Sequence, residues 1–100
     1  MKAVLNGTII AEASEDELVK IEGNWYFPPD SVNHDLLVAS PTLYTCPWKG
    51  KCQYFSVQDG DALLSDRAFS YPDPYPLSFE RVGRDYSKYV AFWKDVQVTE

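Results

Sequence analysis

Turn-forming residues divide this chain into short segments, and their spacing restricts the possible fold more than any other feature of the sequence. Asn6-Gly7, Gly23-Asn24 and Asp59-Gly60 are pairs typical of tight hairpin turns. Prolines interrupt the chain at Pro28-Pro29 and again between Pro72 and Pro76. The runs between these turns are short and rich in aromatic and β-branched residues, which favour strands over helices.

The pattern predicts an all-β (mainly β) domain built from two antiparallel sheets of short strands, or from a barrel-like equivalent. The expected strands are Lys2 to Leu5, Thr8 to Ala13, Leu18 to Glu22, Trp25 to Phe27, Thr42 to Cys46, Cys52 to Val57, Ala62 to Ser65, Ala68 to Tyr71, Leu77 to Val82, Tyr89 to Trp93 and Val96 to Val98. One short helix is expected near residues 30–40, where Asp30 or Ser31 can supply the N-cap. Val32, Leu36 and Leu37 would then share one face of that helix.

Size and charge narrow the classes of function. With 100 residues, the chain is predicted to form a single domain, 1–100. Its 9 Lys and Arg against 15 Asp and Glu give a net charge of −6, which argues against a nucleic-acid-binding surface. No apolar run approaches the ~18 residues of a membrane span. Asn6-Gly7 interrupts the apolar stretch near the N-terminus, so we expect no signal peptide and a cytoplasmic location.

The two cysteines, Cys46 and Cys52, allow several kinds of chemistry. If they face each other across a turn, paired strand positions bring their Cα atoms to about 4.5–5.5 Å, which a disulfide accepts. A cytoplasmic location favours free thiols instead. Zinc would need two further ligands, and His34 is the only histidine. Cys46 is then either a nucleophile, with its thiolate favoured by the ammonium of Lys49, or an inert buried residue.

Three other candidates for chemistry have simpler structural interpretations. His34 could act as a base for Cys46, but a lone histidine is more often a surface or capping residue. Asp59 and Asp61 could hold a divalent metal, yet Asp-Gly is also a common turn. The acidic run from Glu15 to Glu17 is interpreted as an exposed turn. No glycine-rich loop opens a helix, so a phosphate site of that kind is not predicted.

Aromatic residues make up 15% of the chain, and most of them stand in or beside predicted strands. Neighbouring strand residues point to opposite faces, so only one member of Tyr54-Phe55 or Phe92-Trp93 can face a given core. The other members need cover from a second sheet or helix, or else they line a cleft for a ligand. The sequence leaves both interpretations open.

Several motifs occur in an order that is similar to that of a known family. They are Trp25-Tyr26-Phe27-Pro28-Pro29-Asp30-Ser31-Val32, Thr45-Cys46-Pro47-Trp48-Lys49-Gly50, Tyr54-Phe55-Ser56-Val57, Tyr71-Pro72-Asp73-Pro74 and Ala91-Phe92-Trp93. Together they resemble the small bacterial family of domains of unknown function numbered four hundred and twenty-seven, whose name mentions nucleotidyl transfer. The resemblance covers nearly the whole chain, and its most specific part is the Cys-Pro-x-Lys-Gly turn followed by a Tyr-aromatic strand. Phe69 stands where the family usually has Trp, which keeps an aromatic ring there.

The resemblance implies a β-tent, or Mss4-like, arrangement in which two antiparallel sheets meet at an angle. Relatives of that architecture include methionine sulfoxide reductases and ligand-binding domains with aromatic cages. Their zinc-binding cysteine pairs are absent from this sequence, so the resemblance carries over no metal. The sequence also lacks the paired-carboxylate strand expected of a nucleotidyl transferase, and a fold alone does not imply a function.

We therefore expect a functional site in a cleft under the turn from Cys46 to Gly50. Lys49 would be the charge partner of a small anionic ligand or a peptide end, and aromatic side chains would form apolar walls. The candidate ligand-binding residues are Tyr26, Cys46, Trp48, Lys49, Tyr54 and Tyr71. No cofactor, nucleic acid or membrane partner is expected. Two alternatives stay open: a structural or protein-interaction domain that forms a homodimer, and an enzyme that depends on Cys46.

Overall fold

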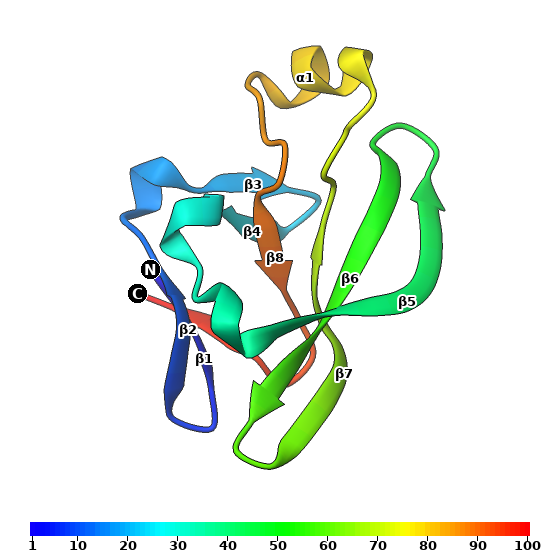
Figure 1. Cartoon of the computed structure of the whole chain (residues 1–100). Helices are drawn as coiled ribbons and strands as arrows, with labels where there is room; N and C mark the ends of the chain where they lie inside the picture. The colour runs from blue at the N-terminus through cyan, green and yellow to red at the C-terminus, as the bar shows by residue number, and fades with distance from the viewer.

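The structure, a computed structural model that describes residues 1–100, consists mainly of antiparallel strands (Figure 1). The strands are β1 (Lys2–Leu5), β2 (Thr8–Glu12), β3 (Val19–Ile21), β4 (Asn24–Phe27), β5 (Leu37–Cys46), β6 (Gly50–Asp59), β7 (Ala62–Ser70), β8 (Val90–Phe92) and β9 (Gln97–Thr99). A small sheet has the order β2-β1-β9, and a large sheet has the order β3-β4-β8-β7-β6-β5. The mainly β fold with two antiparallel sheets is thus confirmed, whereas the β-tent arrangement stays a prediction.

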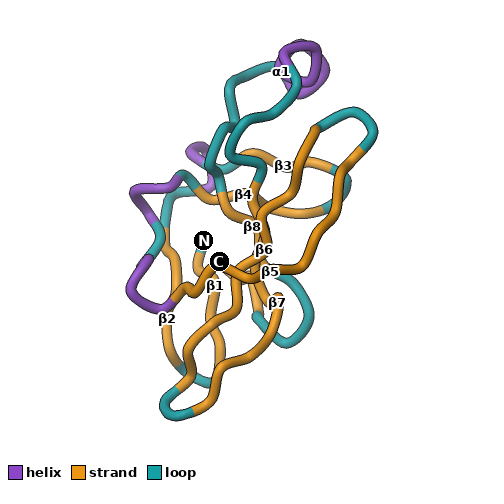
Figure 2. The backbone as a smooth tube through the Cα atoms, turned by 45° about the vertical axis from the view of Figure 1, so that its right-hand side comes forward, coloured by secondary structure: helices purple, strands orange, loops and turns teal.

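The small sheet holds both ends of the chain. Strands β1 and β2 join at Asn6 and Gly7, whose φ angles of 48° and 81° are the positive values that a type I′ turn requires. Strand β9 pairs with the other edge of β1, and Lys2 lies opposite Thr99. The two termini therefore lie close together, as both backbone views show (Figure 2).

In the large sheet, the two strands predicted for Ala62 to Ser65 and Ala68 to Tyr71 are one strand, β7. Asp66 within it has a φ of 54°, and the pairing with β6 shifts register between Phe55 and Val57. Such an irregularity is a β-bulge, which bends a strand without ending it. The bulge explains why the polar residues in this segment look like a turn in the sequence.

The helix expected near residues 30–40 consists of two short 3-10 turns, Pro29–Ser31 and His34–Leu36. The strand β5 already begins at Leu37, which pairs with Val57 of β6. Pairing with β6 therefore overrides the helical pattern at the end of this segment.

The strand predicted for Leu77 to Val82 is wrong, because this segment is the α-helix α1 (Pro76–Val82). Pro76 occupies the first turn, where a missing N–H costs nothing, and Gly83 ends the helix with a φ of 93°. These end signals outweigh the β preference of the residues between them. None of the helices has the length and apolar character needed to cross a membrane.

Two clusters of buried side chains lie on opposite faces of the large sheet. The first contains Phe27 and Phe92 with residues of the small sheet, and the second contains their neighbours Tyr26 and Ala91. Phe79 of α1 packs against this second cluster, with its ring centre 5.8 Å from that of the buried Tyr86. Of the paired aromatic side chains, Phe55 and Phe92 pack in the first cluster, whereas Tyr54 and Trp93 on the other face line a cavity described below.

The α1 segment is fastened by a buried pair of hydroxyls. Ser78, which is 2% exposed, donates a hydrogen bond to the Tyr75 carbonyl and accepts one from the hydroxyl of Tyr86 at 2.9 Å. We expect Ser78→Ala to lower the free energy of unfolding by about 1–3 kcal/mol, because it leaves a buried tyrosine hydroxyl unpaired. Urea unfolding measures the loss. Tyr86→Phe removes that hydroxyl as well and is the matched control, with an expected cost of about 1 kcal/mol. Equal losses in the two variants would contradict the explanation.

Candidate functional site

The turn between β5 and β6 is held at its base by the pairing of Cys46 with Gly50. Gly50 has a φ of 109°, a conformation that favours glycine, and the ring of Tyr75 lies 3.5 Å from where a Cβ would be. The N–H of Tyr75 donates a hydrogen bond to the Lys49 carbonyl at 3.0 Å. The turn is thus fixed against the segment that leads into α1.

The Lys49 side chain points into the protein and is only 4% exposed. Its Nζ donates a hydrogen bond of 2.5 Å to Oε1 of Glu22, a residue on the turn between β3 and β4. The same Nζ lies 4.8 Å from the ring centre of Tyr71, 5.3 Å from that of Trp48 and 6.0 Å from that of Tyr26. A carboxylate and the faces of aromatic rings both stabilise a buried ammonium.

Glu22 reaches Lys49 because of the backbone of its turn. Glu22 and Gly23 have φ angles of 53° and 84°, the positive pair of a two-residue hairpin turn, and the Glu22 side chain is 55% exposed. The hydrogen bond from Lys49 is the main cause that lowers the pKa of the Glu22 carboxyl, with smaller contributions from Trp48 and Arg81. The carboxylate therefore stays ionised beside the ammonium, with one side open to solvent.

An inner cavity of about 350 Å3 opens beside Lys49. Its lining residues are Glu22, Asn24, Tyr44, Cys46, Pro47, Trp48, Lys49, Tyr54, Phe69, Tyr71 and Trp93. Of the six candidate residues from the sequence, Cys46, Trp48, Lys49, Tyr54 and Tyr71 line this cavity. Tyr26 does not, because it is fully buried beneath the Lys49 ammonium. Ligand binding by these residues stays a prediction.

The six other residues of this lining were not predicted as site residues: Glu22, Asn24, Tyr44, Pro47, Phe69 and Trp93. Phe69 and Trp93 meet Tyr54 because β8, β7 and β6 are neighbours in the sheet, and the rings of Tyr54 and Trp93 stack at 6.1 Å. Tyr44 could have been predicted as a site residue from the sequence, because the Pro-Trp-Lys-Gly turn places it opposite Cys52 on the neighbouring strand. For Glu22 the one signal in the sequence is the Glu22-Gly23 pair, which fits a two-residue turn but does not indicate a contact with Lys49.

The geometry does not pair the two cysteines. Cys46 lies opposite Gly50 and Cys52 lies opposite Tyr44, so the thiols occupy diagonal rather than facing positions, and both are free. Burial raises the pKa of the Cys52 thiol, which keeps it protonated at neutral pH. The hydrogen bond of the Lys49 ammonium goes to Glu22 and not to a cysteine.

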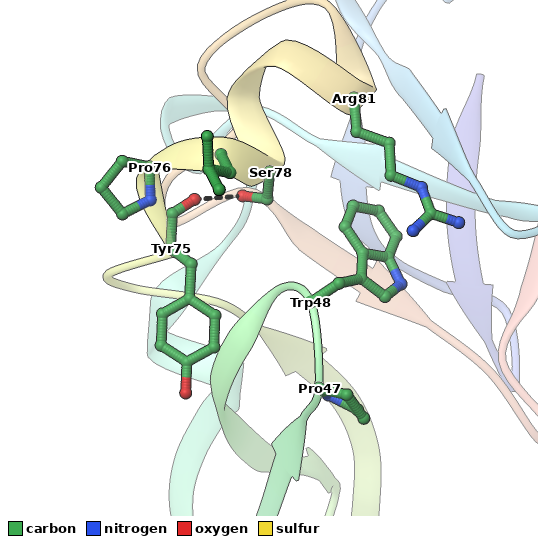
Figure 3. Close-up of a pocket in the computed structure, with 7 residues that line it drawn as sticks. Pro47, Trp48, Tyr75, Pro76, Ser78 and Arg81 are labelled. Carbon is green, nitrogen blue, oxygen red and sulfur yellow. Dashed lines mark hydrogen bonds between the residues drawn. The ribbon is translucent and has the colours of Figure 1, made fainter.

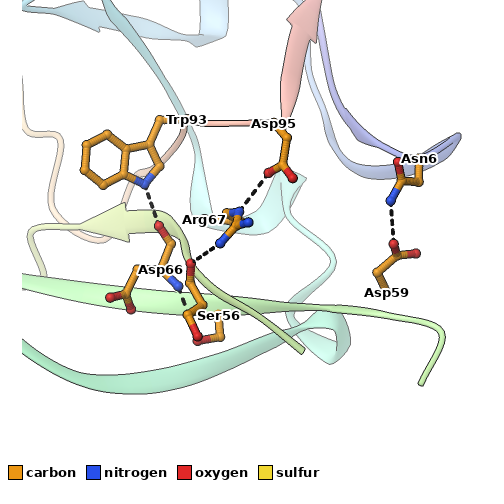
Figure 4. A network of polar contacts seen from close by, with 8 residues as sticks. Asn6, Ser56, Asp59, Asp66, Arg67, Trp93 and Asp95 are labelled. Carbon is orange, nitrogen blue, oxygen red and sulfur yellow. Dashed lines mark hydrogen bonds and ion pairs between the residues drawn. The ribbon is translucent and has the colours of Figure 1, made fainter. Parts of the chain in front are cut away.

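The other residues considered for chemistry have structural contacts. The ring of His34 is exposed and hydrogen-bonds the Pro29 carbonyl at 2.7 Å. Asp59 accepts a hydrogen bond of 2.6 Å from Asn6, which links the tips of two hairpins (Figure 4). Ser14 and Glu17 form a capping box around the acidic 3-10 turn Glu15–Glu17. No group of three or more His, Cys, Asp and Glu side chains is placed to hold a metal ion.

A second concavity, the outer groove, lies between the turn and α1 (Figure 3). It has a volume of about 630 Å3 and is lined by Pro47, Trp48, Tyr75, Pro76, Leu77, Ser78 and Arg81. A smaller hollow of about 250 Å3 is lined by Lys20, Ile21, Glu22, Trp48, Arg81 and Val82. Trp48 lines all three spaces, so its indole ring separates them.

The charge around Trp48 differs in sign from that of the whole chain. The three spaces are lined by the cations Lys20, Lys49 and Arg81 and by a single carboxylate, that of Glu22. The chain as a whole carries a net charge of −6. A cationic concavity on an acidic protein concentrates anions locally.

Comparison with known proteins agrees with the sequence motifs. Residues 1–100 match the model of NTP_transf_9, described as a domain of unknown function (DUF427). The chain belongs to the DUF427 family. No curated protein matches it. Membership covers the whole chain, and the description of the family assigns no ligand or reaction, so the function of this DUF427 domain has to be argued from its site.

The ion pair in the inner cavity gives a direct test of its electrostatics. We expect Lys49→Met to raise the pKa of Glu22 toward its ordinary value of 4.5, because the largest cause of its lowering is gone. Carboxyl carbon NMR titration measures the shift. Lys51→Met, which removes an exposed lysine, is the matched control and leaves the pKa of Glu22 unchanged.

The same pair makes stability depend on pH. A carboxyl whose pKa is lowered by folding adds stability above its unfolded pKa, and this stability is lost as the pH falls through the folded value. The Glu22 side chain is half-exposed, so the contribution is below about 1 kcal/mol. A pKa of Glu22 that does not move in Lys49→Met would contradict the described ion pair.

Proposed function

We propose that this DUF427 domain binds a small anionic ligand, or the carboxyl end of a peptide, in the inner cavity beside the turn from Cys46 to Gly50. The observation that carries the proposal is the buried Lys49 ammonium at the wall of a cavity otherwise built largely from aromatic rings. An ammonium has three N–H donors, and Glu22 accepts from one of them. The others are available to an anion that enters the cavity.

The walls of the cavity suit an apolar or planar body attached to that anion. Tyr54 and Trp93 stack on each other, and Phe69 meets the Trp93 ring edge-on at 5.3 Å. Rings held in this way present fixed apolar faces with little loss of side-chain freedom on binding. Asn24 and Glu22 add polar groups at the rim, and a pocket with apolar walls and a few polar anchors is the common composition of a ligand site.

Glu22 competes with the proposed ligand for Lys49. It lies on an exposed turn, so its carboxylate can turn into solvent when another anion takes its place. The family name mentions nucleotidyl transfer, but the proposal requires only binding. The domain is therefore proposed as a binding module and not as an enzyme.

Removal of the competing charge tests this proposal. We expect Glu22→Gln to bind benzoate and phenyl phosphate up to about fivefold more tightly, since an ion pair whose carboxylate is half-exposed contributes about 0–1 kcal/mol. Lys49→Met should abolish binding. Glu12→Gln, which removes the acid of a surface pair with Lys2 in the small sheet, is the matched control. NMR titration measures the affinities and maps the shifted residues.

A short peptide with a free carboxyl end and its amidated form distinguish the two ligand classes in the same experiment. The proposal predicts shifts at Lys49 and Tyr54 for the anionic probes alone. Equal affinities for benzoate and benzamide would contradict the proposal, and so would unchanged anion binding by Lys49→Met.

A second candidate function is self-association, which the edge strand β5 favours. β5 is the outer strand of the large sheet, and Val38, Leu43 and Tyr44 on it are 44%, 87% and 49% exposed. Antiparallel pairing of two such edges would continue the sheet across a homodimer. Pro41 has no N–H to donate, so pairing would be confined to part of the strand.

Sedimentation at several protein concentrations tests the homodimer. If β5 forms the interface, Leu43→Ser should weaken the dimer by at least about tenfold, because a buried leucine contributes about 1.5–3 kcal/mol. Leu63→Ser changes another half-exposed leucine, on β7, and serves as the control. A monomer at every concentration would rule the candidate out.

A further inference from the structure

We propose that the outer groove is a second binding site, separate from the inner cavity, and that its ligand is a small amphiphilic carboxylate. Such a ligand has an aromatic or branched apolar body with one carboxylate group. The groove is lined by Pro47, Trp48, Tyr75, Pro76, Leu77, Ser78 and Arg81, and it shares only Pro47 and Trp48 with the inner cavity.

The groove offers apolar surface that the fold leaves uncovered. Leu77 is 77% exposed and Tyr75 is 47% exposed, whereas most other large apolar side chains of the chain are packed in the two cores. Figure 3 shows the indole of Trp48 and the ring of Tyr75 on either side of the turn, with the start of α1 above them. The volume of about 630 Å3 lies in the range of small-ligand pockets, roughly 300–1,000 Å3.

The only charged group in the lining is Arg81, and it is the reason why we propose a carboxylate as the charged group of the ligand. Its guanidinium lies 4.2 Å from the centre of the Trp48 ring. Arg81 takes part in none of the ion pairs, which join Lys2 with Glu12, Lys49 with Glu22 and Arg67 with Asp95. Stacking on an indole holds the guanidinium plane while its edges stay free, and those edges bind a carboxylate through two parallel hydrogen bonds.

The walls are set before any ligand arrives. Tyr75 is fixed to the turn through its N–H and the Lys49 carbonyl, and its ring packs on Gly50. Ser78 is fixed to the Tyr75 carbonyl and to Tyr86. A groove built in this way loses little conformational entropy when it is filled, which favours binding of a small molecule with few contacts.

Charge complementarity selects the carboxylate over other apolar ligands. The lining contains one cation and no acidic residue, so a neutral body gains only apolar burial and a cationic one is repelled. A single guanidinium matches a single carboxylate, and the apolar walls on both sides leave no second charged partner for a dianion.

Titration with 3-phenylpropionate, followed by NMR, tests the site, and 3-phenylpropionamide is the neutral probe of the same shape. We expect saturable shifts at Leu77, Arg81 and the Trp48 indole, with the amide binding at least about tenfold more weakly. Arg81→Gln should weaken carboxylate binding by a similar factor, and Arg81→Lys should recover part of it. Arg84→Gln is the matched control, since Arg84 also stacks on an aromatic ring, that of Tyr89, outside the groove.

The outcomes separate this site from the inner cavity. Shifts confined to Tyr44, Tyr54 and Lys49 would overturn the second site while leaving the inner cavity as an anion site. Shifts confined to Leu77 and Arg81 would support the second site and count against the first. Equal affinities for the acid and the amide, or an Arg81→Gln variant that binds as the unchanged protein does, would overturn the assignment of a carboxylate.

Discussion

The buried ammonium of Lys49 is the constraint around which one end of this domain is organised. A charge that is 4% exposed requires a partner, and Glu22 supplies it from a different hairpin, 27 residues away in the sequence. The interaction joins the turn between β3 and β4 to the turn between β5 and β6. These two hairpins lie at opposite edges of the large sheet. Trp48, Tyr71 and Tyr26 surround the ammonium with ring faces, so their positions depend on it as well.

The contacts that join structural elements differ between the two ends of the molecule. At the far end, exposed polar pairs join the elements, as between Asn6 and Asp59 or between Arg67 and Asp95 (Figure 4). These contacts lie in solvent, where each contributes little. Around Trp48 the contacts are partly or fully buried, and three concavities open between them. Buried polar contacts of that kind hold side chains in fixed positions, which a binding site needs and a hairpin tip does not.

The sequence was sufficient for features that depend on local chemistry. Asn6-Gly7 was predicted as a hairpin turn from its residue pair, and the turn after Cys46 from an early proline and a late glycine. The aromatic neighbours of that turn were predicted as its walls. Features that depend on distant residues were not predictable. Glu22 gains its role only when two hairpins meet, and Trp93 joins the cavity only because β8 lies beside β7. The helix α1 was missed for another reason, since Leu77, Phe79 and Val82 favour a strand while Pro76 and Gly83 decide in favour of a helix.

If the inner cavity binds an anion as proposed, the ion pair also limits which anions can enter it. Glu22 is tethered beside Lys49, so its carboxylate is present at a high effective concentration, and a free anion of the same kind gains nothing by replacing it. A ligand succeeds only if the rest of the molecule adds binding energy that Glu22 lacks. Tyr54, Phe69 and Trp93 offer that energy as apolar surface next to the pair. In the proposed site, the tethered carboxylate would act as a filter against small inorganic anions and in favour of anions joined to an apolar body.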